Sequence, residues 1–310
     1  MGGVSLETWL VFGAIVAAAI FADLLLFRPK TDGVSLARAM TETAAWIALA
    51  LLFGIWILVS RGRQAGVEYF TAYVLEKSLS ADNVLLFLVI FRAFGIGPRA
   101  QHRVLFSGIV GALVLRLAFV VAGIALLKHF HAVLYLFGAF LCAVGIAMLI
   151  PRRSAPHPER NWMVQFVGKV LPVSHSPDEE RFLVRGETGW SATPLLLALV
   201  AIEATDVVFA ADSVPAVLAI TRDAFIAYSS NVFAILGLRA MYFGLAEVMA
   251  RMRFLHQGLA VILLFVGGKM LASERITLSA GASLGVIVTI LAIVGVASWL
   301  APGNTNARPD

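Results

Sequence analysis

The 310-residue chain has little cysteine and little charge. It contains one cysteine, Cys142, which excludes an internal disulfide framework and a cysteine-based metal cage. Walker, GxSxG, HExxH and dinucleotide-binding motifs are also missing, so the sequence does not indicate ATP-driven transport, and we expect no enzyme. Only 14% of the residues are charged, 60% are hydrophobic, and the mean hydropathy is +0.89. This composition predicts an all-α polytopic membrane protein in a lipid bilayer.

Nine apolar stretches are long enough to cross a bilayer as helices of about 20 residues. We therefore predict about nine transmembrane helices, at roughly 6–27, 41–60, 67–94, 104–127, 131–150, 191–220, 224–249, 254–272 and 279–300. The prolines and mixed charges of the long polar stretch at 151–190 predict a mobile cytoplasmic linker, and a folded regulatory element is the alternative. The predicted segments are an N-terminal helix pair (1–66), a first repeat (67–150), the linker (151–190), a second repeat (191–272), and a C-terminal helix and tail (273–310).

The distribution of Lys and Arg predicts how these helices are oriented. With the N-terminus outside, 15 basic residues fall in the inside loops and six in the outside loops. Positive charge collects on the cytoplasmic side of membrane proteins. We therefore expect an inner-membrane protein with its N-terminus outside and its C-terminus inside. Because the basic residues lie at the ends of apolar runs, the net charge of +5 does not indicate a nucleic-acid partner.

Two of the apolar stretches contain a pair of acids with the same spacing. Glu76 is followed six residues later by Asp82, and Asp206 by Asp212. Asn83 follows the second acid of the first pair, and Ser213 takes the matching place in the second pair. An ionised side chain at bilayer depth costs roughly 2.5–3.5 kcal/mol on insertion scales, so a repeated pair indicates function.

A later basic residue extends the match between the two halves. Arg116 follows the first acidic stretch in the next apolar stretch, and Arg239 follows the second. The two units begin three predicted spans apart, so they would cross the membrane in opposite directions. Inverted three-helix repeats of this kind place a transporter's substrate site between them, near the midplane. Chance similarity between apolar helices is the alternative, and it explains the repeated acid spacing poorly.

The intramembrane charges do not balance. Five acids, which are the two pairs and Glu203, stand against three bases, Lys77, Arg116 and Arg239, which leaves two negative charges in excess if all ionise. A divalent cation or the protonation of two acids would restore balance. Carboxylates with nearby Asn and Ser oxygens suit Mg²⁺, Ca²⁺ or Mn²⁺ better than zinc or copper. The predicted metal ligands are Glu76, Asp82, Asp206 and Asp212, supported by Asn83, Ser213, Glu203 and Asn231, with Lys77, Arg116 and Arg239 compensating charge.

Helix geometry restricts how such a site could form. Six residues turn a regular helix through about 600°, so the members of each pair lie about 120° apart. They converge only on a broken helix or around a wide cavity. Pro215 removes one backbone hydrogen bond, and we expect it to break the sixth helix. In the structural alternative the charges only join helices, Glu76 or Asp82 with Arg116, and Asp206 or Asp212 with Arg239.

Three segments resemble the TerC/Alx family of membrane proteins. EKSLSADNV (76–84) is similar to its E-x-S-L-S-x-D-N pattern, IEATDVVFAADSVPA (202–216) to E-x-T-D-x-x-F-A-x-D-S-x-P-A, and SNVFAILGLR (230–239) to a third block. The similarity extends over about residues 5–300, and every acidic motif position is present. The resemblance implies an inner-membrane protein related to LysE-type exporters. It also associates the chain with tellurite resistance, the response to alkaline pH, manganese efflux and metal supply for exported proteins.

Residues and resemblance together predict a transporter of divalent metal cations that exports Mn²⁺ from the cytoplasm. Mn²⁺ would be the transported or bound ion, and coupling to protons through the carboxylates is an option. Two alternatives stay open. One is a membrane partner that delivers metal to exported proteins, and the other is an exporter of small basic organic solutes. The sequence identifies no protein partner.

Overall fold

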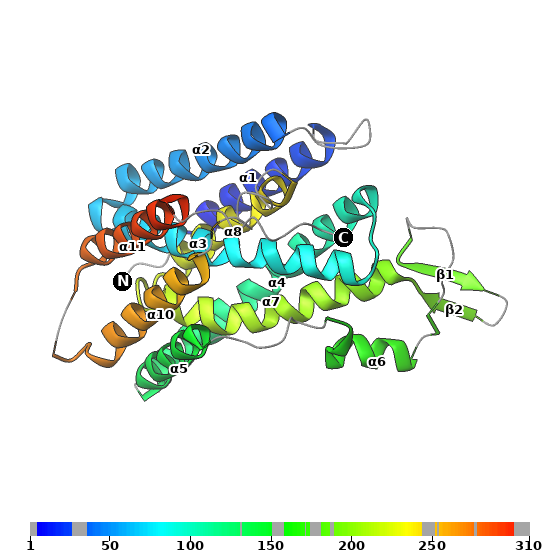
Figure 1. Ribbon diagram of the computed structural model, residues 1–310. Helices are drawn as coiled ribbons and strands as arrows, with labels where there is room; N and C mark the ends of the chain where they lie inside the picture. Colours follow the sequence, from blue (N-terminus) through cyan, green and yellow to red (C-terminus); the bar gives the residue numbers. More distant parts are fainter. Residues whose placement is uncertain are drawn as a thin grey trace.

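The computed structural model describes residues 5–26, 36–130, 132–150, 158–170, 172–173, 181–186, 189–243, 252, 254–275 and 278–300, apart from a few side chains that include Asp82. Long helices dominate this part of the chain (Figure 1). The helices are α1 (Leu6–Leu26), α2 (Leu36–Arg61), α3 (Arg63–Ala93), α4 (Pro98–His129), α5 (Ala132–Leu149), α6 (Trp162–Val170), α7 (Pro194–Leu218), α8 (Ala224–Leu236), α10 (Leu255–Leu271) and α11 (Ala280–Leu300). Residues 238–243 are also helical, and a 3₁₀ turn, η1, covers Pro158–Arg160.

Capping residues mark several helix starts. Thr193 precedes α7 and its hydroxyl accepts a hydrogen bond from the Leu196 N–H, while proline occupies the first position of the helix. Asp223 caps α8 in the same way, because its carboxylate accepts from the N–H groups of Phe225 and Ile226. These polar caps occur where an apolar run begins, so local sequence signals mark where α7 and α8 start.

Membrane-spanning helices are confirmed, and their exact number stays a prediction. Within the described residues, six helical stretches are long and apolar enough to cross a bilayer: Ala37–Arg61, Pro98–His129, Ala132–Leu149, Pro194–Leu218, Ala224–Phe243 and Ala280–Leu300. Shorter apolar helices cover Leu6–Ala22 and Leu255–Leu271. The 31-residue α3 is long enough, but charged residues within it lower its hydropathy. A helix therefore lies in each of the nine predicted stretches.

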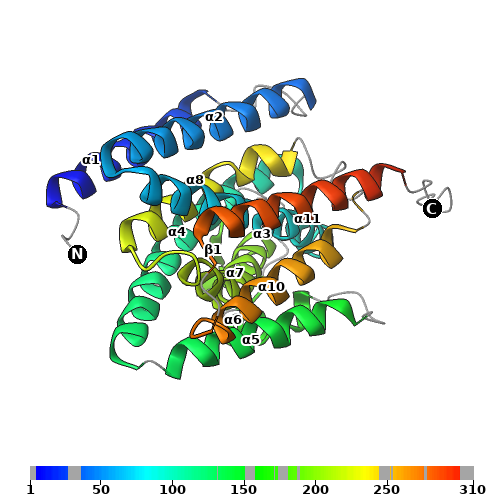
Figure 2. The ribbon, with the colours of Figure 1, turned by 90° about the vertical axis from the view of Figure 1, so that its left-hand side faces the viewer.

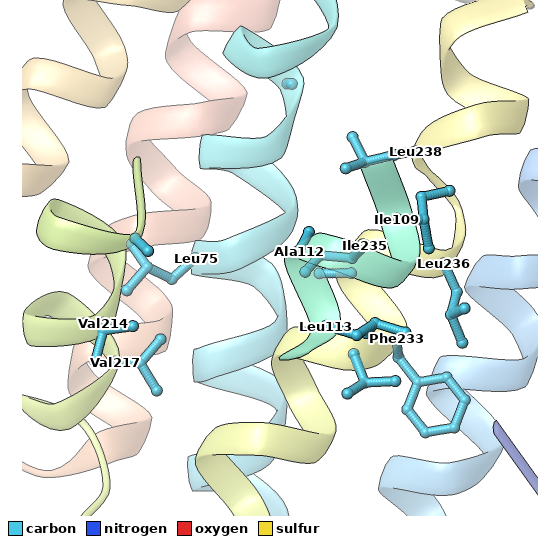
Figure 3. Close-up of a cluster of buried hydrophobic side chains, with 14 of the residues drawn as sticks. Leu75, Ile109, Ala112, Leu113, Val214, Val217, Phe233, Ile235, Leu236 and Leu238 are labelled. Carbon is cyan, nitrogen blue, oxygen red and sulfur yellow. The ribbon is translucent and has the colours of Figure 1, made fainter. Parts of the chain in front are cut away.

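The helices pair across the two halves of the chain. α3 packs on α8, α4 packs on α7, and α5 packs along α10. α3 and α7 lie in the interior, with α1 and α2 on one side and α5 on the other (Figure 2). Figure 3 shows Ile109, Ala112 and Leu113 of α4 directed toward Phe233 and Ile235 of α8. Each predicted repeat thus supplies its first helix to the second helix of the other, as a twofold relation requires. The inverted repeat itself stays a prediction.

The prediction of a broken sixth helix is wrong. α7 is continuous from Pro194 to Leu218 and contains Pro215 in its last turn. Proline there removes the hydrogen bond to a single carbonyl, and the helix closes normally one turn later, where the Ala219 N–H donates to the Pro215 oxygen at 3.0 Å. The interruption lies instead in the next predicted span, where α8 ends at Leu236 and a turn at Gly237 precedes the helical residues 238–243.

The predicted mobile linker contains regular structure. Besides η1 and α6, it includes a two-stranded antiparallel sheet, β1 (Leu183–Gly186) and β2 (Gly189–Ala192), which ends next to α7. α6 packs against α7, and Val164 of α6 is buried. The elements gather at one end of the molecule (Figure 1). Part of the predicted linker is therefore a folded element attached to the helices, because α6 offers an apolar face that the prolines and charges of the segment concealed.

The backbones of α5 and α10 approach closely at two glycines, Gly138 and Gly267. A Cβ at Gly267 of α10 would lie 2.7 Å from the Gly138 oxygen of α5, whereas a Cβ at the adjacent Gly268 would meet nothing within 4 Å. We expect Gly267→Ala to lower the unfolding free energy by about 1–3 kcal/mol, since the helices must separate. Gly268→Ala should cause no loss. Thermal unfolding of the purified protein in detergent measures both, and equal stabilities would contradict this packing.

Candidate ion-binding site

A buried arginine joins acids from both halves of the chain. Arg116 of α4 donates through Nη1 to Glu76 Oε2 of α3 at 2.7 Å and to Ser213 Oγ of α7 at 2.8 Å. Its Nη2 donates to Asp206 Oδ1 of α7 at 3.2 Å. We call Arg116, Glu76, Asp206 and Ser213 the Arg116 cluster. The structural alternative considered for the sequence paired Arg116 with Glu76 or Asp82, and it did not include Asp206 on the same guanidinium.

The Arg116 cluster is almost completely removed from solvent. Arg116 and Glu76 are each 1% exposed, and Asp206 is 6% exposed. Burying charges in this way costs several kcal/mol per ion, which the pairing recovers only with good geometry and full hydrogen bonding. The hydrogen bonding here is incomplete. In the part of the chain that the structure describes, Glu76 Oε1, Asp206 Oδ2 and Arg116 Nε are buried without a partner.

The side chains of Asn83, Asn231 and Ser80 also bury oxygens that have no partner among the described residues. Asn83 Oδ1 and Ser80 Oγ belong to α3, and both amide atoms of Asn231 belong to α8. A buried polar group without a hydrogen bond costs about 1–3 kcal/mol, so several in neighbouring helices indicate a ligand or ordered water. All of these oxygens are of the neutral or carboxylate type that hard cations prefer.

A cavity of about 620 Å³ begins at the Arg116 cluster. Arg116, Ser213, Asn83 and Asp212 form its polar wall, and the remaining polar lining comes from Asn161, Thr205 and His256. Most of the other lining residues are apolar, and they come from α3, α5, α7 and α10. Pro158 of η1 lines the cavity as well, so the predicted linker contributes to its wall. Sequence reasoning missed Asn161 and His256, because no motif connects them with the acids, and it gave no role to Thr205, although Thr205 directly precedes Asp206 in the second family motif.

The structure separates the two acids of the second pair. Asp206 points to Arg116, whereas the partly buried Asp212 lines the cavity, as expected for residues about 120° apart on an unbroken helix. Asp82 lies within α3, but its side chain is outside the described residues. Among the side chains that are described, no three from His, Cys, Asp and Glu form a metal-binding group. The predicted four-carboxylate ligand set therefore stays a prediction.

The other predicted residues occupy separate places. The Glu203 carboxylate lies against Gly111 of α4, where a Cβ would overlap it. Lys77 contacts no described acid and donates to the Ala234 oxygen of α8 at 3.3 Å. Asp206 pairs with Arg116, so of the two acids considered as partners of Arg239 only Asp212 is left, and that pairing stays a prediction. The pairing of Asp206 with Arg116 depends on how α4 and α7 rotate against each other, which sequence spacing does not specify.

The Arg116 cluster should dominate the stability of the helix bundle. Arg116→Gln leaves two buried carboxylates without their cation, and we expect a loss of about 3–5 kcal/mol in unfolding free energy. Arg61→Gln is the matched control, since Arg61 pairs with Asp223 at 2.6 Å where both side chains are about one-quarter exposed, and it should cost about 1 kcal/mol or less. Denaturant unfolding in detergent compares the two. Similar losses would contradict the buried pairing.

Comparison with known proteins adds the family. Residues 61–306 match the sequence profile of the integral membrane protein TerC family. An uncharacterized membrane protein of Myxococcus xanthus is 40% identical over 94% of this chain and 92% of its own length. The Escherichia coli K12 protein Alx, described as a candidate membrane-bound redox modulator, is 40% identical over 97% of this chain and 96% of its own length. No solved structure matches. The chain, with its membrane-spanning helices, belongs to the TerC family of integral membrane proteins.

Proposed function

We propose that this protein transports divalent metal cations and exports Mn²⁺ from the cytoplasm across the inner membrane. The observation that carries the proposal is that Glu76 Oε1, Asp206 Oδ2 and Asn83 Oδ1 are buried without a partner among the described residues, and that Asn83 and Arg116 line the same cavity. Such oxygens are costly in a membrane unless a ligand compensates them. A hard cation is a ligand that these carboxylate and amide oxygens can hold.

Charge supports a divalent ion. Glu76, Asp206 and Asp212 contribute three negative charges when ionised, and Arg116 contributes one positive charge, which leaves a surplus of two. One Mn²⁺ would neutralise this surplus. When the ion is absent, Arg116 holds Glu76 and Asp206 as a tethered counter-charge. When the ion binds, the carboxylate oxygens turn to it and the guanidinium gives up part of its contacts.

The donor set favours Mn²⁺, Mg²⁺ or Ca²⁺ over softer metals. Glu76 and Asp206 supply carboxylate oxygens, Asn83 and Asn231 supply amide oxygens, and Ser80 supplies a hydroxyl. Six or more oxygen ligands are typical for such ions, and water can complete the shell from the cavity. No thiolate competes, because Cys142 is the only cysteine of the chain and lies in α5.

The positions of the cavities support alternating access. The cavity at the Arg116 cluster extends toward η1, α6 and the start of α10, which belong to the predicted cytoplasmic side. A second cavity of about 750 Å³ lies at the opposite ends of α3, α7 and α10. Between the two cavities, Leu75, Val214 and Val217 are buried and their side chains lie near one another (Figure 3). Rocking of the two halves would open this apolar layer and release the ion outside.

A second candidate substrate is a small organic cation. The specific observation is the cavity wall, where Leu86, Val89, Val144, Phe209 and other apolar side chains outnumber the polar ones. Apolar walls with one acid suit an aliphatic ammonium better than a hydrated metal ion. Uptake of Mn²⁺ and of lysine or arginine into inside-out vesicles shows which substrate is carried. Mutual inhibition of the two uptakes would show that they compete for one site.

Neutralising the site should stop transport without removing the protein from the membrane. In proteoliposomes we expect Asp212→Asn and Glu76→Gln each to lower Mn²⁺ flux at least about tenfold, since each removes a charge and a ligand of the ion. Asp223→Asn is the control. It removes a carboxylate at the predicted outer end of α8, keeps a good helix cap and should transport normally.

The flux assay uses a manganese-sensitive dye inside the vesicles and a panel of Mn²⁺, Mg²⁺, Ca²⁺ and Zn²⁺ at several pH gradients. Protein in the membrane is measured for every variant. Normal flux in both Asp212→Asn and Glu76→Gln would refute the ion site.

A further inference from the structure

The end of α8 lies inside the apolar interior. The helical stretch Ala224–Phe243 is a candidate span of which 89% is buried, and it is interrupted by the turn at Gly237. The last four carbonyls of any α-helix lack donors within that helix, and their partial negative charge adds to the helix dipole. In a bilayer no bulk water reaches such groups, so another group must satisfy them.

Lys77 supplies a positive charge at this helix end. Its Nζ donates to the carbonyl oxygen of Ala234, two residues before α8 ends, at 3.3 Å. The same nitrogen lies so close to Gly237 that a Cβ there would be 2.7 Å away. Trp46 of α2 covers the other side of Gly237. Glycine at the turn therefore leaves the space that the ammonium group occupies.

Lys77 has no acidic partner in the part of the chain that the structure describes. The carboxylate of the adjacent Glu76 binds Arg116, and the Lys77 ammonium donates to the Ala234 carbonyl of α8. The ammonium thus takes the place that a bound monovalent cation takes at the carbonyl end of a discontinuous transmembrane helix. It was predicted as a charge-compensating partner of the acids, and the contact with Ala234 suggests another task.

This contact also links the two sides of the candidate ion site. Lys77 is next to Glu76 on α3, and Ala234 is three residues after Asn231 on α8, which is about one helical turn. The hydrogen bond from Nζ to the Ala234 carbonyl restricts how far α8 can slide along α3. The buried amide of Asn231 thereby keeps its position along the helix axis relative to the Glu76 carboxylate.

We propose that Lys77 is a positioning residue whose ammonium acts as a tethered monovalent cation at the carbonyl end of α8. It holds α8 against α3 and sets Asn231 for ion binding, a role that rests on the proposed transport function. If the side chain is shortened, the vacated place should accept a small free ammonium ion.

Two variants test this role through stability. Lys77→Ala removes the ammonium and leaves space, whereas Lys77→Met removes it and fills most of the space. We expect both to unfold at lower temperature than the wild type in choline chloride. Replacing choline by methylammonium at equal ionic strength should raise the unfolding temperature of Lys77→Ala and leave Lys77→Met and the wild type unchanged. A Lys77→Met protein as stable as the wild type, or a Lys77→Ala protein that responds equally to both salts, would overturn the proposal.

The transport arm repeats the comparison with Mn²⁺ flux in proteoliposomes without a pH gradient. Lys77→Ala should lower the Mn²⁺ flux about tenfold, which corresponds to the free energy of one hydrogen bond to a charged group. Methylammonium should restore part of this flux. Restored stability without restored flux would reject the link to Asn231. A wild-type protein that does not move Mn²⁺ would refute the proposed function, and the unfolding measurements would still decide whether Lys77 serves as the tethered cation.

Discussion

One buried guanidinium holds the two halves of the chain together. Arg116 comes from the first half, and it binds one carboxylate from each half within 3.2 Å. None of the three charged groups is more than 6% exposed, so each depends on the others for compensation. The packing of α3 on α8 and of α4 on α7 brings these residues together, and the charges in turn restrict how far the helices can shift.

The same constraint supports the proposal that the cluster is a transport site rather than a purely structural one. A structural ion pair is stable when every donor and acceptor is satisfied, but among the described residues Glu76, Asp206 and Arg116 each keep a buried atom without a partner. Because its hydrogen bonding is incomplete, the Arg116 cluster can rearrange its contacts at a low cost in free energy. The adjacent cavity, with Asp212 and Asn83 in its wall, supplies the space for that exchange.

Much of the fold could be predicted from the sequence, because apolar runs of membrane length and polar caps such as Asp223 are local signals. The acids Glu76 and Asp206 were also predictable, since charge at bilayer depth is rare. The pairing of Asp206 with Arg116 rather than with Arg239 was not predictable, because it depends on how the helices rotate against each other. Pro215 was misjudged since a proline in a last turn interrupts little, and α6 was hidden by the prolines around it.

The wall contribution of Pro158 and Asn161 gives the connection between the halves a role beyond tethering. Hydrophilic stretches between membrane segments are the usual places for affinity tags, fluorescent proteins and engineered protease sites. In this protein an insertion directly before α6 would lie next to the cavity at the Arg116 cluster. Reporter fusions are better attached elsewhere, and natural variation in the length of this stretch should be narrower than its composition suggests.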